Sequence, residues 1–103
     1  MTSKEIDKIQ LEKILGSPIR IKILKELSAE LELNKTEIVR RTNNNNKTIS
    51  FHLKCLIDLN VLQEKRFGRV KIYRLKTEHG KIQELQDFLL RLNKEDNYNE
   101  TKI

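Results

Sequence analysis

Apolar side chains recur at helical spacing along residues 1–15, the first of several such stretches in the chain. Thr2 and Glu5 fit a capping box at its start, and Gly16 is suited to end the helix in the left-handed conformation. The apolar stripe consists of Ile6, Ile9, Leu11, Ile14 and Leu15. A helix this apolar needs a surface to pack on, and the pattern leaves open whether that surface is the chain's own core or a second copy.

Two further helices follow, each with a polar residue placed to cap it. Ser17 and Pro18 begin a helix that we expect to continue to about Leu31, because serine caps helices and proline fits the first turn. Its inward side chains are predicted to be Ile19, Ile23, Leu24, Leu27 and Leu31. Asn34 then caps a short helix, and the two arginines that close it suit the negative end of the helix dipole.

Residues 43–59 combine a polar turn with the most clearly two-sided helix of the chain. The four asparagines Asn43–Asn46 predict a turn, with Asn44 or Asn45 as the cap of the next helix. One face of that helix carries Ile49, Leu53, Leu56 and Ile57, and the opposite face carries Lys47, Phe51, Lys54 and Asp58, with Thr48 and Ser50 on the flanks. A short helix, a tight turn and an amphipathic helix in this order predict a helix-turn-helix.

The pattern changes to that of a β-hairpin over residues 62–75. Gly68 provides the positive φ that a tight turn needs, so we place the turn at Phe67 and Gly68. That turn sets up the cross-strand pairs Arg66–Arg69, Lys65–Val70, Glu64–Lys71 and Leu62–Tyr73. The last two pairs are complementary in charge and in apolarity, which favours this register.

A last helix is predicted from Glu78 to Leu92, with Thr77 as its cap. Its apolar residues follow the spacing of a coiled-coil seam, at Ile82, Leu85, Leu89 and Leu92, and Phe88 and Leu90 widen that surface. Two heptads are enough for packing against a second copy or against the first helix. Residues 94–103 have no period, so we expect a disordered tail there.

These elements predict one winged helix-turn-helix domain, mostly α with a small β-hairpin, over residues 1–93. Its parts are an N-terminal helix (1–15), a winged-helix core (17–75) and a C-terminal helix (77–93), the two outer helices serving for dimerisation. Apolar residues make up 37% of the chain and charged residues 35%, which is little core for a monomer and favours additional burial in a dimer.

Positive charge is concentrated in one third of the chain. Residues 40–74 hold nine cations and two acids, a net charge of +7, whereas the remaining 12 cations and 13 acids sum to −1. A basic region that coincides with the helix-turn-helix and the hairpin indicates a polyanionic partner. We therefore interpret residues 45–59 as a DNA-recognition helix.

Four segments of the sequence resemble the ArsR-type transcriptional regulators: LGSPIRIKILKEL, TEIVRRT, KTISFHLKCLIDLNVL and KRFGRVKIYRL. The residues that match that family's pattern are Thr48, Ile49, Ser50, His52, Leu53, Leu56, Val61, Leu62, Gly68 and Tyr73. The resemblance covers residues 15–75. It implies a homodimeric transcription factor whose terminal helices form the dimer interface and whose wings flank the DNA. We expect dimer contacts from Ile6, Ile9, Ile82, Leu85, Phe88, Leu89 and Leu92.

Many members of the family sense metals through cysteines or through carboxylate and histidine sets, and this chain departs from them. Residues 36–42 contain no cysteine, and the last helix offers only Glu78 and His79. Zinc needs three or four donors, so we predict no metal and no cofactor. The departure fits a small archaeal or viral regulator, as does the bias toward Ile, Lys and Asn.

The recognition helix is expected to lie in the major groove of double-stranded DNA. Asn46 is suited to adenine, and Lys47 and Lys54 to guanine or phosphate. Thr48 and Ser50 are assigned to phosphate oxygens. Other basic residues are expected to follow the backbone or enter the minor groove: Arg40, Arg41, Lys65, Arg66, Arg69 and Lys71.

Three residues of the recognition helix have alternative interpretations. Phe51 either contacts a thymine methyl group or is a shielded ring that packs on the wing or a neighbour. His52 is expected to be a structural hydrogen-bonding residue, not a ligand or base. Cys55 is the chain's one cysteine, which excludes an internal disulfide and favours a reducing, cytoplasmic location, with a redox role as the alternative.

The sequence favours a sequence-specific DNA-binding regulator over four other classes of protein. A non-specific architectural binder and a winged helix used for protein contact are the alternatives. An enzyme is not expected, because no nucleophile–base pair, carboxylate pair or glycine-rich phosphate loop is visible. RNA binding fits poorly without interleaved aromatic residues. We also expect no signal peptide and no membrane partner, because the apolar runs are too short to cross a bilayer.

Overall fold

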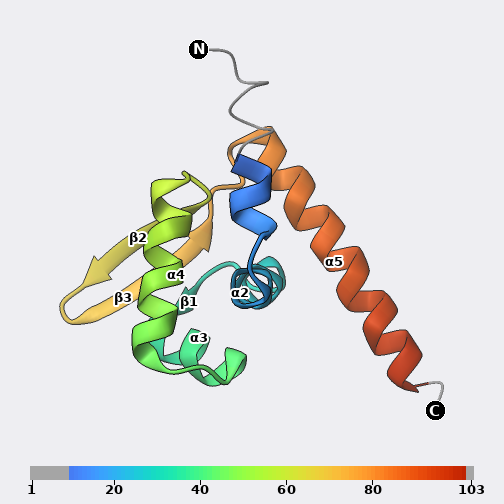
Figure 1. The fold of residues 1–103 in the computed structure, drawn as a ribbon, viewed down its shortest axis with the longest axis horizontal. Helices are drawn as coiled ribbons and strands as arrows, with labels where there is room; N and C mark the ends of the chain where they lie inside the picture. Colours follow the sequence, from blue (N-terminus) through green and yellow to red (C-terminus); the bar gives the residue numbers. More distant parts are fainter. Residues whose placement is uncertain (1–9, 102–103) are drawn as a thin grey trace.

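The computed structural model describes the backbone of residues 10–101 and the side chains of residues 10–94. Residues 10–15 are helical. The later elements are α2 (Pro18–Ser28), β1 (Leu33–Asn34), α3 (Lys35–Thr42), α4 (Asn46–Asp58), β2 (Leu62–Phe67), β3 (Val70–Leu75) and α5 (Gly80–Thr101) (Figure 1). The fold is mostly helical with a small antiparallel sheet in the order β1-β3-β2, which confirms the predicted fold class. Ile6 and Ile9 lie outside the described residues.

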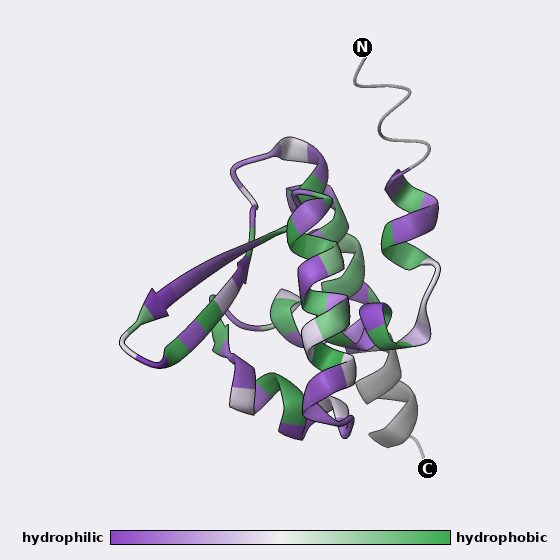
Figure 2. Ribbon diagram, turned by 60° about the vertical axis from the view of Figure 1, so that its left-hand side comes forward, coloured by the Kyte–Doolittle hydropathy of each residue, from purple (hydrophilic) through white to green (hydrophobic). Residues whose placement is uncertain are grey.

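Helix α2 lies at the centre and packs against α3, α4 and α5. The β2–β3 hairpin projects from one side of the helices, and α5 runs along the opposite side (Figure 1). The buried face of α4 is the predicted one, because Ile49, Leu53 and Leu56 are at most 1% exposed. They join a core that also contains Ile14, Ile23, Leu24, Leu27, Leu33, Ile38, Val61, Leu62, Tyr73, Leu75 and Leu89. Hydrophobic and hydrophilic segments alternate along the projecting hairpin (Figure 2).

Side-chain caps form at the predicted starts of α2, α3 and α4. The oxygen of Asn34 accepts from the backbone N–H of Glu37 at 2.8 Å, and that of Asn45 accepts from Thr48 N–H at 2.8 Å. Ser17 accepts from Arg20 N–H at 3.4 Å. Asn43 ends α3 in the left-handed conformation (φ 53°), a conformation that asparagine tolerates better than most residues. These local bonds hold α3 and α4 on either side of a tight turn.

Helix α2 ends at Ser28, so the prediction that it continues to Leu31 was wrong. The Ser28 hydroxyl donates to the carbonyl of Lys25 at 2.7 Å, and Leu31 is 94% exposed instead of facing inward. The chain turns here because residues 33 and 34 form a third strand, β1, which pairs with β3. The sequence pattern did not predict this strand, since two residues are too few to produce a period.

The predicted hairpin register was also wrong. The turn consists of Gly68 and Arg69, so the actual pairs are Phe67–Val70, Arg66–Lys71, Lys65–Ile72, Glu64–Tyr73, Gln63–Arg74 and Leu62–Leu75. Gly68 has φ 62°, and Arg69 is not among the residues with positive φ. A glycine with positive φ at only the first turn position is the pattern of a type II′ hairpin. The register therefore moves Phe67 out of the turn and into the end of β2.

Helix α5 starts and ends later than predicted. Thr77 does not cap it, because its N–H bonds to the Leu75 carbonyl at 2.9 Å in a turn, and the helix begins at Gly80. It continues to Thr101 instead of ending near Leu92, since no proline or glycine interrupts it after Gly80. Side chains of α5 also bond to the end of α2: Gln86 to the Ser28 carbonyl at 3.3 Å and Asn93 to the Lys25 carbonyl at 3.4 Å.

Candidate nucleic-acid interface

The outer face of α4 carries the polar and basic residues that the sequence predicted there. Asn46, Lys47 and Lys54 are exposed, and Thr48 and Ser50 are half-buried. Phe51 is 61% exposed in the middle of this face. Its ring forms a T-shaped contact with the neighbouring His52 ring, with 5.1 Å between centroids. The exposed fraction shows that the hairpin does not cover the Phe51 ring, which remains accessible to a partner.

A hollow of about 420 Å³ lies between α4 and the inner face of the hairpin. We call it the helix–hairpin hollow. It is lined by Lys35, Ser50, Leu53, Lys54, Ile57, Asp58, Glu64, Arg66, Lys71 and Tyr73. Four of these residues are cations and two are acids. Lys35 was missed as a site residue; the strand β1, which places the first turn of α3 beside β3, has no sequence signal that would have pointed to it.

The two acids of the hollow are already engaged. Asp58 pairs with Lys54 at 3.5 Å, and Glu64 pairs with Arg66 at 3.7 Å. Glu64 also accepts a hydrogen bond from the buried Tyr73 hydroxyl at 2.9 Å. Burial, and then this bond, raise the pKa of Tyr73, so its hydroxyl stays protonated and remains a donor. Among residues 10–94, Lys35 and Lys71 have no carboxylate within ion-pairing distance, and they leave the hollow positive.

The tip of the hairpin continues the positive surface. Arg66 and Lys71 face each other on the side of the hollow, and Lys65 and Arg69 are exposed near them. The like-charged pair predicted at the tip, Arg66 with Arg69, is thus replaced by Arg66 with Lys71. All four cations stand within seven residues that contain no acid.

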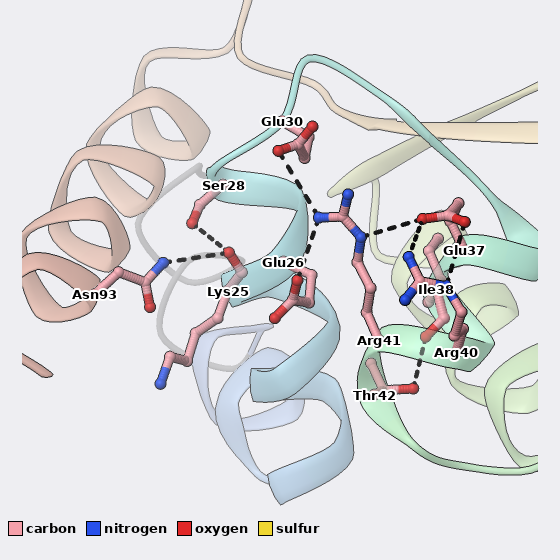
Figure 3. Close-up of polar contacts among 10 residues, drawn as sticks. All are labelled: Lys25, Glu26, Ser28, Glu30, Glu37, Ile38, Arg40, Arg41, Thr42 and Asn93. Atoms are coloured by element: carbon pink, nitrogen blue, oxygen red, sulfur yellow. Dashed lines mark hydrogen bonds and ion pairs between the residues drawn. The ribbon is translucent and has the colours of Figure 1, made fainter. Parts of the chain in front are cut away.

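Arg40 and Arg41, predicted to reach phosphate, are both bonded to carboxylates (Figure 3). Arg41 points toward Glu26 at 3.4 Å, Glu30 at 3.7 Å and Glu37 at 3.4 Å, and so ties α3 to the end of α2. Within residues 10–94, Arg40 pairs only with Glu37, at 2.7 Å, and its side chain is 67% exposed. The hydrogen bond from Arg40 lowers the pKa of Glu37, which keeps that carboxylate charged. Arg40 is therefore more exposed than Arg41 and is bonded to fewer carboxylates of the described residues.

A model of the "Bacterial regulatory protein, arsR family" matches residues 17–64, which run from the cap of α2 into β2. The solved structure of the transcriptional repressor PagR of Bacillus anthracis is 30% identical to the chain. The match covers 84% of this chain and 95% of PagR, with a TM-score of 0.71. The chain belongs to the arsR family.

Other solved structures agree in fold. HlyU from Vibrio cholerae matches with a TM-score of 0.77 and 22% identity over 89% of this chain and 97% of HlyU. The transcriptional repressor BigR from Xylella fastidiosa matches with a TM-score of 0.67 and 23% identity over 89% of this chain and 96% of BigR. A comparison with curated protein sequences finds no significant match. The chain therefore shares its winged helix-turn-helix fold with HlyU and with the repressors PagR and BigR.

His52, which matches the family pattern, is a hydrogen-bonding residue, as expected. Its Nδ1 accepts from Arg20 Nε at 3.1 Å, and Arg20 also donates to the Lys13 carbonyl. Burial, and then the charge of Arg20, lower the pKa of His52, so the ring is neutral near pH 7. Arg20 in this way links α4 to the helix of residues 10–15.

Other kinds of site are sparse in this member of the arsR family. No group of three or more His, Cys, Asp or Glu side chains in the described part of the chain is arranged to hold a metal ion. Glu78 bonds instead to Arg74 at 2.9 Å. None of the described helices has the length and hydrophobicity needed to cross a membrane. Cys55 is a half-buried free thiol.

Proposed function

We propose that this arsR-family protein is a sequence-specific, double-stranded DNA-binding transcription regulator that acts as a homodimer. The observation that carries the proposal is the continuous basic surface formed by the outer face of α4, the helix–hairpin hollow and the hairpin tip. Residues 45–59 lie in the major groove in this proposal, and the hairpin of residues 62–75 contacts the adjacent backbone and minor groove. The family membership and the match to PagR, itself a transcriptional repressor, support it.

The helix–hairpin hollow gives the proposal its geometry. A helix in the major groove has a sugar–phosphate ridge on each side, and the hairpin stands beyond one of them. The hollow between α4 and the hairpin, with its excess of cations, is suited to this ridge. Lys35 and Lys71 are the residues we expect to neutralise phosphate there, because neither has a carboxylate partner in the described part of the chain. Asn46, Lys47 and Phe51 are left to face the bases.

The homodimer is supported by apolar surface on the other side of the molecule. A groove of about 790 Å³ separates the helix of residues 10–15 from the start of α5. Leu11, on its rim, is 52% exposed, and Phe88 of α5 is 48% exposed. Of the expected dimer residues, Leu89 is 2% exposed and packs within its own chain, and Ile82, Leu85 and Leu92 are half-buried against the core. A second copy would therefore cover the exposed edge of α5 and not its whole seam.

The test is binding to a labelled duplex from the gene's own upstream region, against a scrambled duplex, over a salt series. We expect tighter binding to the upstream duplex that persists at about 200 mM salt, and an inverted-repeat footprint with half-sites about 34 Å apart. Equal binding to both duplexes that disappears with salt would indicate an architectural binder. Binding to neither would refute the proposal and favour a protein-contact module.

Two lysine variants distinguish the contribution of the basic surface to DNA binding from the effect of the protein's total charge. Lys71→Ala is expected to reduce the slope of log affinity against log salt by about 0.9 for each phosphate that is no longer neutralised, or about 1.8 per dimer. Lys94→Ala removes an exposed lysine from the far part of α5 and is the matched control, for which we expect an unchanged slope. Analytical ultracentrifugation of the same samples would establish whether two copies are present. Equal slopes for the two variants would show that Lys71 does not neutralise phosphate.

A further inference from the structure

The hairpin tip has an apolar side that the basic surface does not explain. Phe67 and Val70 are direct cross-strand partners next to the turn, and they are 61% and 48% exposed. They lie on the opposite face of the hairpin from Arg66 and Lys71, because successive residues of a strand alternate in direction. We call Phe67 and Val70 the tip pair.

Phe67 of the tip pair is one of three phenylalanines that the fold leaves outside the core. All three phenylalanines of the chain are exposed, at 61% for Phe51, 61% for Phe67 and 48% for Phe88, while leucine and isoleucine dominate the core. Phe51 lies on the recognition face, and Phe88 lies on α5, where we propose a second copy. Phe67 stands at the far end of the hairpin, where nothing in the described part of its own chain covers more than part of the ring.

The charges around the tip pair identify its partner as a polyanion. Lys65 lies on the same face as the tip pair, Arg69 lies in the adjoining turn, and Arg66 and Lys71 lie on the opposite face of the same tip. No acid occurs between residues 65 and 71. An apolar ring framed by cations matches the minor groove of DNA, where sugar faces and base edges lie between two rows of phosphates. The helix–hairpin hollow adds a geometric reason, because a phosphate ridge seated there leaves the tip over the neighbouring minor groove.

We propose that the tip pair is an apolar wedge that enters the minor groove and opens one base step, with Phe67 as the wedge and Val70 as its support. This inference rests on the DNA binding proposed above. Phenylalanine is among the residues that architectural proteins insert between base steps, and pyrimidine–purine steps such as TA are the easiest to unstack. The protein then selects its DNA sites partly by the flexibility of one base step that lies outside the bases contacted by α4.

The proposal is tested by selecting bound duplexes from a random pool with the wild type and with a Phe67→Thr/Val70→Thr double variant. Threonine is β-branched and is favoured in strands, but it lacks the apolar surface of phenylalanine and valine, so the hairpin is expected to remain folded without the wedge. Leu31→Thr is the control, because Leu31 is 94% exposed and lies outside the hairpin. Circular dichroism of all three proteins verifies folding.

We expect the wild type and Leu31→Thr to enrich a pyrimidine–purine step at one position flanking each half-site. The double variant should retain the half-site preference, lose the flanking preference, and bind the TA-flanked duplex about fivefold less tightly, the lower end of the cost of one wrong base pair. With 2-aminopurine at that step, the wild type should raise the fluorescence by unstacking the base, and the double variant should not.

Three results carry different conclusions. If the wild type selects no duplex at all, the DNA-binding function itself fails. If the wild type selects a half-site and the double variant selects the same half-site with the same flanking step, the wedge is refuted although DNA binding stands. A uniform decrease in affinity for every duplex, without a change in the preferred step, also refutes the wedge, since the pair would then strengthen binding without choosing a step.

Discussion

Glu64 is an acidic residue of the helix–hairpin hollow, and removing its charge should strengthen DNA binding. Its carboxylate sits among four cations, 3.7 Å from Arg66 Nε and 2.9 Å from the Tyr73 hydroxyl. Glu64→Gln removes the negative charge and keeps an oxygen that can accept from Tyr73. The variant therefore changes the charge of the hollow with little change in its shape.

The expected gain follows from the repulsion between Glu64 and a bound phosphate. For a phosphate about 8 Å away and an effective dielectric constant between about 20 and 80, that repulsion is roughly 0.5–2 kcal/mol per protomer. Binding should thus tighten at least about twofold at low salt, and less at high salt, where charges this far apart are partly screened. The free energy of unfolding of Glu64→Gln should decrease by roughly 1 kcal/mol, because the hydrogen bond from Tyr73 loses its charged acceptor.

Fluorescence anisotropy with the upstream duplex measures the affinity, and urea unfolding measures the stability. Glu84→Gln makes the same change of charge at an exposed position on α5 and should leave affinity unchanged. If Glu64→Gln binds DNA more weakly than the wild type while it is folded and dimeric, the hollow does not hold phosphate. An equal gain in Glu84→Gln would mean that overall charge, not the hollow, controls binding.

Three further changes test other parts of the structure. Arg41→Gln should lower the free energy of unfolding by roughly 1 kcal/mol, because it breaks partly exposed ion pairs between α2 and α3. Arg40→Gln is the comparison in the same urea assay. An equal decrease for both variants would contradict the role of Arg41 in joining α3 to α2. Leu53→Ala should cost roughly 3–5 kcal/mol in urea unfolding, since Leu53 is 1% exposed; a decrease below about 1 kcal/mol would contradict its place in the core. The lowered pKa of His52 means that the unfolded chain binds its proton more readily, so this residue's contribution to stability is present above pH 6.5 and is lost as pH falls below it. Urea unfolding from pH 7 to pH 5 should show a smaller decline in stability for His52→Gln than for the wild type, and an identical decline would refute the lowered pKa of His52.

The elements that could be predicted from the sequence are those set by neighbouring residues. The caps at Asn34 and Asn45 bond to N–H groups three residues ahead, and the buried face of α4 follows from helical spacing alone. The position of the basic surface also followed from the sequence, because its residues are consecutive along α4 and the hairpin. Local hydrogen bonds and periodicity are therefore enough to identify the helix-turn-helix and the region of the site.

The hairpin register depends on a choice that local chemistry leaves open. Gly68 fits a two-residue turn either with Phe67 before it or with Arg69 after it, and both choices give plausible pairs. Tertiary contacts favour the second, because it pairs the two buried leucines at the base, Leu62 and Leu75, and brings the Tyr73 hydroxyl to Glu64. Register follows the burial of one face of the sheet, and that face packs against the helices α2, α3 and α4, which the hairpin sequence does not contain.

Pairing of charges is the part of the site that sequence reasoning could least predict. A sum over residues 40–74 counts Arg41 as a free cation, but its carboxylate partners in the described part of the chain, Glu26, Glu30 and Glu37, all lie outside that window. The same sum overlooks Lys35, which β1 places beside the hairpin. The total charge of the region is thus a good guide to the kind of partner, because it depends only on composition. The residues that meet that partner depend on which cations the fold has already neutralised.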